Sequence, residues 1–215
     1  MYLPAHFRED RLPVLHDLIR THGFATLVAL GAEGLVANHI PLLLDAAGGA
    51  LGTLRGHVAR ANPLWQTFRP EVEALAIFHG PHAYISPSLY PAKQETGKVV
   101  PTWNYAVVHA YGPLRPVEDA AWLRRLVEDL TRRHEAGRAN PWQVSDAPEP
   151  YIGQMLKAIV GLEIPVARLE GKWKVSQNRP PQDRAAVAAD LNRSDDPARR
   201  ALAALVTEAG QKPAL

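Results

Sequence analysis

The chain has 215 residues, of which 47% are hydrophobic and 21% charged, and its formal net charge is +2. This composition supplies enough apolar side chains for a globular core without disulfide bonds. Because the sequence contains no cysteine, it excludes a disulfide scaffold, a thiol nucleophile, zinc–thiolate sites and cysteine-ligated iron–sulfur clusters. The mild positive charge allows an anionic ligand but does not require nucleic acid.

The N-terminal segment MYLPAHFRED does not resemble a signal peptide, because Pro4, Glu9 and Asp10 interrupt any apolar stretch. No run in the sequence approaches the ~18 apolar residues of a membrane span. We therefore expect a soluble protein of the cytoplasm.

The first predicted element is a helix over residues 12–22. Its apolar residues recur on one helix face, Pro13 suits the first turn, and Gly23 is a natural stop. Strands are then expected at 25–30, 35–45 and 50–58. Because the separators between them are short and rich in glycine and alanine, we predict an antiparallel meander rather than βαβ units.

The middle of the chain predicts short elements and one long strand. A helix at 59–68, interrupted near Asn62 and Pro63, precedes strands at 73–79 and 83–86. After a proline-rich loop, VVPTWNYAVVHAYG (99–112) is typical of a long strand. Large side chains with polar tips, such as Trp103 and Tyr105, need hydrogen-bond partners wherever they are buried in it.

The last part of the chain is mainly helical. Residues 117–136 form the clearest helix, with an apolar face and outward i,i+4 charge pairs such as Glu128 with Arg132. The remaining elements are a helix at 152–160, a strand at 162–177 and two alanine-rich helical segments. About seven strands, grouped early, and about five helices predict a mainly β fold with flanking α-helices, in which an antiparallel barrel is closed or nearly closed. We expect one domain over residues 1–180 with inserted helices, and a helical tail over 181–215 that packs on the barrel.

The histidines allow a metal site but do not require one. His79 and His82 have HxxH spacing, but the Gly-Pro pair between them breaks a helix, so we expect the imidazoles to splay around a turn. With no HExxH motif and no paired carboxylates nearby, hydrogen-bonded histidines at strand ends are the better interpretation. His39 and His57, on adjacent strands, either line a pocket or are bystanders. We expect no metal.

The motifs of nucleophilic catalysis and of common nucleotide folds are missing. No GxSxG elbow surrounds Ser86, Ser88 or Ser176. The sequence also contains neither a Walker loop nor a GxGxxG motif after a strand. We therefore assign no catalytic residue.

Two polar segments suit a phosphorylated, heteroaromatic ligand. In LRGHVARANP, Arg60 and Asn62 lie between a strand end and a helix start, where an arginine and backbone N–H groups can hold a phosphate. The alternative is a helix breaker beside a solvated arginine. In KWKVSQNRPPQDR, Gln177 and Asn178 suit the rim of such a ligand. The alternative there is a solvated loop.

Five segments in register resemble the FMN-binding negative transcriptional regulators, the PaiB family. They are MYLPAHF, GHVARANPLW, FHGPHAYISPSLY, VPTWNYAVVHAYG and KVSQNRPPQDR, and the resemblance runs from Met1 to about Val187. It implies an antiparallel split β-barrel of the FMN-binding type. It also implies a homodimer, since related split barrels hold FMN in a groove between two subunits.

The resemblance further implies the residues of the cofactor site. Arg60 and Asn62 would take the phosphate, with His57 nearby, and the other residues would line or close the flavin pocket, some of them from the second subunit. The complete set is Asn38, His39, His57, Arg60, Asn62, Tyr84, Ile85, Ser86, Trp103, Asn104, Tyr105, Gln177, Asn178 and Arg179. Leu89 departs from the tryptophan that the family pattern leads us to expect, which would loosen the site if that side chain stacks on the ligand.

Three functions remain open. The family resemblance favours a flavin-dependent regulator, a flavin-dependent oxidoreductase is the first alternative, and a haem- or tetrapyrrole-binding protein is the second. DNA binding has weak support, because the one pattern like a helix-turn-helix, residues 184–205, places Asp195 and Asp196 where a phosphate contact would be needed. For that segment we expect two surface helices that pack on the barrel.

Overall fold

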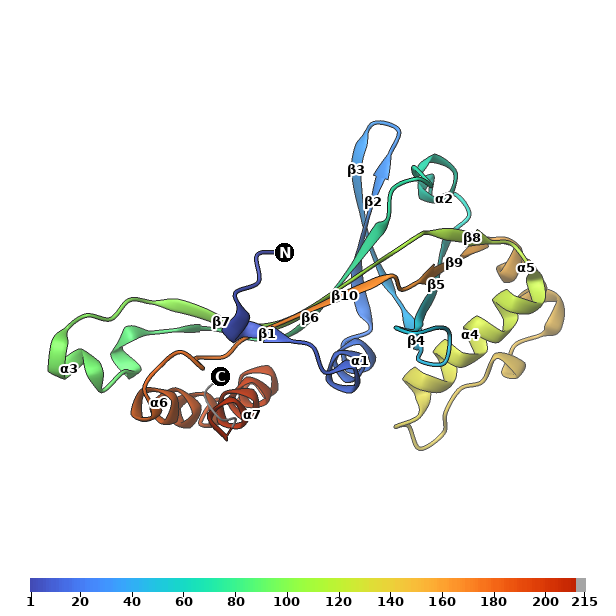
Figure 1. The fold of residues 1–215 in the computed structure, drawn as a ribbon. Coiled ribbons are helices and arrows are strands. Elements are labelled where there is room, and N and C mark those ends of the chain that lie inside the picture. Colours follow the sequence, from blue (N-terminus) through green and yellow to red (C-terminus); the bar gives the residue numbers. More distant parts are fainter. Residues whose placement is uncertain (212–215) are drawn as a thin grey trace. The chain divides into compact units, whose positions relative to one another are not determined.

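The computed structural model describes residues 1–211 and divides into two compact units (Figure 1). Unit 1 comprises Met1–Leu18, His79–Val108 and the part of the chain from Glu170 onward, and unit 2 comprises Ile19–Phe78 and His109–Leu169. Strands β6 (Ala74–Ile85) and β7 (Thr102–Gly112) continue from one unit into the other. No helix within residues 1–211 is long and apolar enough to cross a membrane.

Unit 2 contains antiparallel strands of two sheets. In the first, β6 is followed by β2 (Phe24–Gly31) and β3 (Gly34–Pro41), and in the second the order is β4 (Leu43–Asp45), β5 (Thr53–Ala59), β9 (Ile159–Pro165) and β8 (Arg115–Val117). Alternate residues of β2 are buried, as expected for a strand with one face on the core. A two-residue turn joins β2 to β3, since Gly31 pairs with Gly34. Gly34 has a φ of +127°, a conformation that other residues rarely adopt.

The prediction of one strand over 35–45 is wrong, because this segment passes from one sheet to the other at Leu42. Its side chain is 2% exposed, and its N–H donates to the carbonyl of Gly23 at 2.8 Å. The chain therefore leaves the β2 ladder there and resumes as β4, which pairs with β5. The three predicted strands are thus four, and they do not form a single meander.

The helices of unit 2 are α2 (Leu64–Thr67), α4 (Ala120–Glu135) and α5 (Glu149–Lys157), together with the 3₁₀ turn η3 (Val144–Asp146). The carboxylate of Asp119 caps α4 by accepting from the backbone N–H of Trp122 at 2.7 Å. The buried face of α4 includes Leu123, Leu126 and Leu130, which confirms the helix predicted from its apolar spacing.

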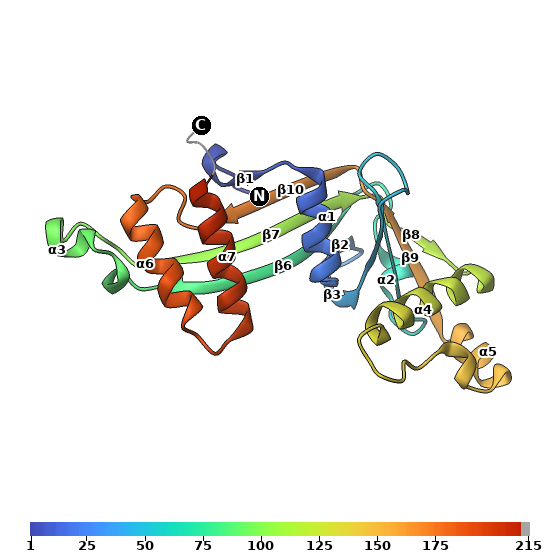
Figure 2. The ribbon, with the colours of Figure 1, turned by 90° about the horizontal axis from the view of Figure 1, so that it is seen from below.

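In unit 1 the strand order is β1 (Arg8–Glu9), β10 (Arg168–Lys174), β7 and β6. Helices α6 (Pro181–Asn192) and α7 (Pro197–Gln211) lie across one face of these strands (Figure 2). Leu191 and Leu202, one from each helix, are fully buried. The shorter elements are η1 (Ala5–Phe7), η2 (Pro87–Leu89) and α3 (Ala92–Thr96), and α1 (Leu12–Thr21) runs across the division between the units. Residues 212–215 of the predicted tail lie outside the described part of the chain.

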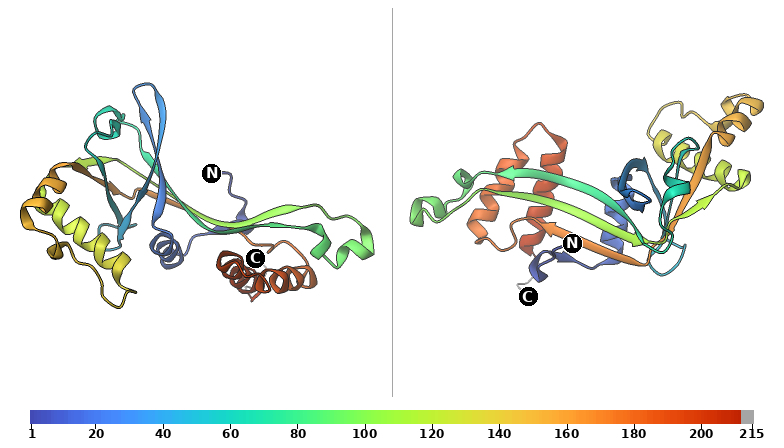
Figure 3. Two further views of the ribbon diagram at one scale, coloured as in Figure 1. Left: turned by 180° about the vertical axis from the view of Figure 1, so that it is seen from behind. Right: turned by 90° about the horizontal axis from the view of Figure 1, so that it is seen from above.

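β6 is one continuous strand, so the prediction of two strands separated by a turn at Gly80 and Pro81 is wrong (Figure 3). β2 pairs with β6 only from Leu75 to Ile77. Because Pro81 lies beyond that ladder, its missing N–H removes no hydrogen bond to β2. Gly80 is needed for packing, since a Cβ there would lie 2.9 Å from the side chain of Leu18 and 3.1 Å from the carbonyl oxygen of Ala106.

Within residues 1–211 the structure has ten strands and seven α-helices, more than the seven and five expected. The extra elements are mostly short. Two-residue β1 and three-residue β4 and β8 have too few positions for a period of two to be recognised in the sequence.

Candidate functional site

The residues predicted to bind a cofactor fall into both units. Unit 2 holds Asn38, His39, His57, Arg60 and Asn62, and unit 1 holds Tyr84, Ile85, Ser86, Trp103, Asn104, Tyr105, Gln177, Asn178 and Arg179. We refer to them as the amide–histidine cluster of unit 2 and the aromatic cluster of unit 1.

Asn38 and Asn62 form a directed pair in the amide–histidine cluster. The backbone N–H of Leu64 donates to Oδ1 of Asn62 at 2.9 Å, so Nδ2 of Asn62 is the group that donates to Oδ1 of Asn38 at 2.6 Å. This arrangement leaves Nδ2 of Asn38 as a buried donor without an acceptor among residues 1–211. An unpaired buried donor costs about 1–3 kcal/mol, which is recovered when a ligand supplies an acceptor.

His57, on β5, is the second polar group of this cluster that lacks a partner. Its Nδ1 is buried and makes no hydrogen bond within the described part of the chain. Burial lowers the pKa of the imidazole below its usual value, so the ring is neutral near pH 7. A neutral imidazole presents one donor and one acceptor to a ligand.

Arg60 is already engaged by neighbouring groups. Its Nη1 contacts a carboxylate oxygen of Glu118 at 2.6 Å, its Nε donates to the carbonyl of Lys157 at 2.8 Å, and its Nη2 donates to the carbonyl of Ile159 at 3.2 Å. The guanidinium also lies 5.6 Å from the ring centroid of Trp65. Because three of its five N–H groups are used, a phosphate here would meet the remaining two and would compete with Glu118.

His39 lies on the exposed side of β3 at the edge of its sheet. Its Nδ1 is 3.2 Å from the hydroxyl of Thr26, its partner in the β2–β3 ladder. The Phe24 ring lies 6.4 Å from the imidazole, centroid to centroid. Both Phe24 and Leu35 are strongly exposed, at 69% and 79%, so this edge has an uncovered apolar surface.

Within the aromatic cluster of unit 1, Tyr84 and Trp103 lie on the exposed sides of β6 and β7. The Trp103 ring stacks with His82 at 5.9 Å and meets Tyr84 edge-on at 6.3 Å, centroid to centroid. Trp103 and Tyr84 are 48% and 49% exposed. Sequence reasoning did not place His82 here because it assumed a turn at Gly80-Pro81, and the continuous strand brings His82 and Tyr84 to one face.

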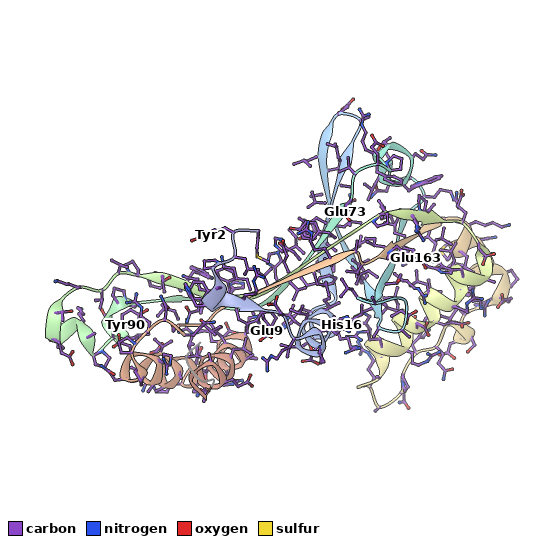
Figure 4. All side chains as sticks on the ribbon, viewed as in Figure 1. Tyr2, Glu9, His16, Glu73, Tyr90 and Glu163 are labelled. Carbon is purple, nitrogen blue, oxygen red and sulfur yellow. The ribbon has the colours of Figure 1, made fainter. Side chains whose placement is uncertain are left out.

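Two lysines border this cluster, and sequence reasoning assigned neither to the site. Lys172 Nζ donates to the backbone carbonyl of Tyr2 (Figure 4) and lies 5.6 Å from the Tyr105 ring centroid. Lys174 Nζ donates to the hydroxyl of Thr102 and to the carbonyl of Trp103. Burial lowers the pKa of Lys174, and the charges of Lys172 and Arg179 lower it further. Both lysines lie on β10, two residues apart, so strand alternation places them on the same face. This alternation is the signal from which the two lysines could have been grouped as one site feature.

Asn104 and Ile85, two further residues of this cluster, are buried and do not share the exposed side of Trp103 and Tyr84. Asn104 is 1% exposed, and its Nδ2 donates to the hydroxyl of Ser176 at 2.8 Å. Ile85 is fully buried, next along the strand from exposed Tyr84. Successive residues of a strand face opposite sides, so Asn104 and Ile85 support the strands that present Trp103 and Tyr84.

The segment after β10 is a tight turn held by its own side chains. Ser176 has a left-handed φ of +65°, and Gln177 accepts from the N–H of Val175 and donates to the carbonyl of Trp173. The guanidinium of Arg179 lies 4.8 Å from the Tyr90 ring centroid. A strained residue inside a polar turn is typical of a functional segment.

Ser86 and Asn178 make few contacts. Ser86 Oγ accepts from the N–H of Ser88 at 3.2 Å and so caps η2. Asn178 is exposed, so its amide is open to a ligand.

Comparison with known proteins identifies relatives over nearly the whole chain. The family model described as "Putative FMN-binding domain" matches residues 1–168. "Protease synthase and sporulation protein PAI 2" of Bacillus subtilis is 32% identical over 211 residues, which cover 97% of each chain. "Uncharacterized protein AN0679" of Emericella nidulans is 35% identical over 246 residues, which cover 98% of each.

Solved structures share the fold at low identity. "Conserved hypothetical protein Rv2991" of Mycobacterium tuberculosis aligns with a TM-score of 0.56 and 13% identity, over 84% of this chain and 94% of that one. The "FAD and Heme binding protein" of Mycobacterium smegmatis aligns with a TM-score of 0.56 and 16% identity, over 78% and 73%. The predicted fold class, an antiparallel split β-barrel of the FMN-binding type with flanking α-helices, is confirmed.

Proposed function

Because the chain belongs to the family of the "Putative FMN-binding domain" and is related to PAI 2 of Bacillus subtilis, we propose that it binds FMN and acts as a flavin-dependent regulator. The FMN would supply redox chemistry through its isoalloxazine ring. The side chains of this protein would bind and orient it.

The observation that carries the proposal is the unpaired buried donor of Asn38, together with the unpaired Nδ1 of His57 in the same cluster. A flavin ring offers carbonyl oxygens, ring nitrogens and one N–H, which match a carboxamide N–H and a neutral imidazole. The Asn62–Asn38 bond keeps the carboxamide turned so that its N–H₂ end is the free one. The donor set therefore fits the cofactor.

The aromatic cluster supports the same ligand. Trp103 and Tyr84 present exposed ring surface, and stacking between aromatic rings contributes about 0.5–1.5 kcal/mol beyond burial. Lys172 lies near the Tyr105 ring, and Lys174 contacts the backbone carbonyl of Trp103. Their positive charges favour a negatively charged, phosphorylated ligand.

A homodimer accounts for the exposed apolar side chains of the β2–β3 edge and of β7. Phe24 and Leu35 on the β2–β3 edge, and Trp103 on β7, expose large apolar areas. An edge strand with uncovered apolar side chains is a site for pairing with another chain. We propose that a second copy covers these surfaces and that each FMN contacts side chains of both subunits.

The regulatory role is supported by the relationship to PAI 2, whose name connects that protein with protease synthesis and sporulation. In α6 and α7, Asp190 engages two of the arginines, contacting Arg193 and Arg199 at 3.5 and 3.2 Å. Direct DNA binding by these helices gains no support from this pairing, so we propose regulation through flavin-dependent association.

The test is titration of the flavin-free protein with FMN and riboflavin, together with an absorption spectrum of the purified protein. We expect saturable FMN binding and a flavin spectrum, and Asn38→Ala should weaken both ligands about tenfold. Asn140→Ala, an exposed asparagine of unit 2, is the matched control and should change neither. A Soret band would instead identify a haem protein, and turnover of a substrate by the bound flavin would identify an oxidoreductase.

A further inference from the structure

Unit 2 contains a groove that shares no residue with either predicted cofactor cluster. It lies between α4 and the β4–β5 pair and has a volume of about 760 Å³. The residues that line it are Leu43, Leu44, Asp45, Arg55, Trp122, Arg125, Leu126, Asp129, Arg132, Arg133 and Ala136. A volume of ~300–1,000 Å³ is typical of sites for small organic ligands.

The apolar part of the lining comes from both sides of the groove. Leu43 lies on β4 opposite Arg55, and Trp122 and Leu126 lie one helical turn apart on α4. Together these three residues offer a surface on which an alkyl or aromatic group can be buried, at about 25 cal/mol per Å² of apolar area.

The charged part of the lining is arginine-rich, and its two acids already have partners. Asp45 contacts Arg55 at 2.9 Å, and Asp129 contacts Arg132 at 2.8 Å. This leaves two positive charges without a counter-ion in the groove.

Those two charges belong to Arg125 and Arg133, which are exposed and take part in none of the ion pairs within residues 1–211. Arg124 differs clearly, because it contacts Glu128 at 3.0 Å and Glu149 at 2.5 Å outside the groove. On α4, the arginine outside the groove, Arg124, is therefore neutralised by glutamates. Arg125 and Arg133, which line the groove beside its apolar surface, are not.

We propose that this groove binds an amphipathic anion, with an apolar body on Leu43 and Trp122 and an acidic head group attracted by the positive charges of Arg125 and Arg133. The guanidinium groups of arginine match carboxylate and phosphate oxygens with paired N–H donors. The inference is independent of FMN, because it rests on different residues.

Decanoate, used below the concentration at which it forms micelles, is a suitable probe for calorimetry on the full chain. We expect one saturable site per chain, and the double variant Arg125→Gln/Arg133→Gln should weaken binding roughly tenfold or more. The matched control is Arg20→Gln/Arg115→Gln, which removes two exposed arginines of unit 2 that do not line the groove. Its affinity should equal that of the wild type.

Two further ligands, decyl phosphate and decylamine, distinguish the chemistry of the head group. Decyl phosphate should bind if the head group can be a phosphate, and decanoate alone should bind if it must be a carboxylate. Decylamine, with the opposite charge, should not bind. Equal binding of decylamine and decanoate, equal losses in the two double variants, or displacement of decanoate by FMN would overturn the proposal.

Discussion

Nδ2 of Asn62 donates to Oδ1 of Asn38 at 2.6 Å, and this bond decides which end of Asn38 is free. The orientation of Asn62 is fixed in turn by Leu64, whose N–H donates to its Oδ1 at the start of α2. A local helix-start interaction thus controls a buried donor on β3, a different strand. The consequence can be measured in the flavin-free protein.

We expect Asn62→Ala to lower the free energy of unfolding by about 1–2 kcal/mol, because it removes the acceptor of the Leu64 N–H and the donor to Asn38. Asn38→Ala should cost less than about 1 kcal/mol, since it removes a bond together with an unsatisfied donor. Urea unfolding measures both, with Asn140→Ala as the control. If Asn38→Ala is the more destabilising change, its Nδ2 already has a partner.

A second prediction concerns the Glu118–Arg60 ion pair. Removing the carboxylate charge with Glu118→Gln should free the guanidinium, so FMN should bind more tightly while riboflavin, which lacks the phosphate, is unaffected. Arg60→Ala should have the opposite effect on the ratio of the two affinities. Both are measured by titration of flavin fluorescence. Equal changes for FMN and riboflavin would remove Arg60 from the phosphate site.

A third prediction follows from the lowered pKa of His57. Below the unfolded value of about 6.5, and above the folded pKa, the unfolded chain binds a proton that the folded chain does not. The free energy of unfolding should therefore fall with decreasing pH in this window, by at most about 1.4 kcal/mol per pH unit from this group. Unfolding of His57→Gln at several pH values should show a shallower decline, whereas His134→Gln, at an exposed position, should match the wild type. An unchanged slope in His57→Gln would mean that His57 is not the titrating group.

The sequence predicted best what depends on short-range periodicity. The spacing of Leu123, Leu126 and Leu130 predicted α4, and Pro13 and Gly23 marked the limits of α1 closely. It failed where distant contacts decide the conformation. Leu42 leaves its ladder because its N–H meets the Gly23 carbonyl, and Pro81 stays within a strand because β2 ends its pairing at Ile77. Neither partner can be identified from the local sequence.

In the predicted site, too, the local sequence indicated some residues, whereas contacts between distant segments decided the rest. Motif positions indicated Asn38 and Asn62, but not which of their amide atoms would be free, since that depends on Leu64. Lys172 and Lys174 are recognisable as basic residues in the sequence but were not assigned to the site, because they approach the aromatic strand from a segment about 70 residues further along the chain. Only the sheet topology brings β10 beside β7.

A fourth prediction concerns the β2–β3 edge. Leu35→Glu should shift a dimer toward the monomer in sedimentation, because it places a charge on apolar surface that is 79% exposed in one chain. Val72→Glu, at another exposed aliphatic position of unit 2, is the control and should leave the distribution unchanged. A wild-type protein that is a flavin-loaded monomer at micromolar concentration would contradict both the dimer and the shared site.

The last prediction separates two neighbours in the VVPTWNYAVVHAYG strand. Trp103 is half exposed, whereas Asn104 is buried and donates to Ser176. Trp103→Ala should therefore change stability little but weaken FMN roughly two- to tenfold, since stacking contributes about 0.5–1.5 kcal/mol. Asn104→Ala should lower the free energy of unfolding by about 1–3 kcal/mol, because it breaks a buried hydrogen bond.

Urea unfolding and FMN titration of the same two variants test this directly. Trp142→Ala, which truncates a similarly exposed indole in unit 2, should leave both readouts unchanged. If Asn104→Ala abolished FMN binding while the apo protein kept its stability, the carboxamide would have to contact the flavin. The observed alternation of β7 gives the opposite expectation: the indole meets the ligand, and the carboxamide holds the strand to the turn at Ser176.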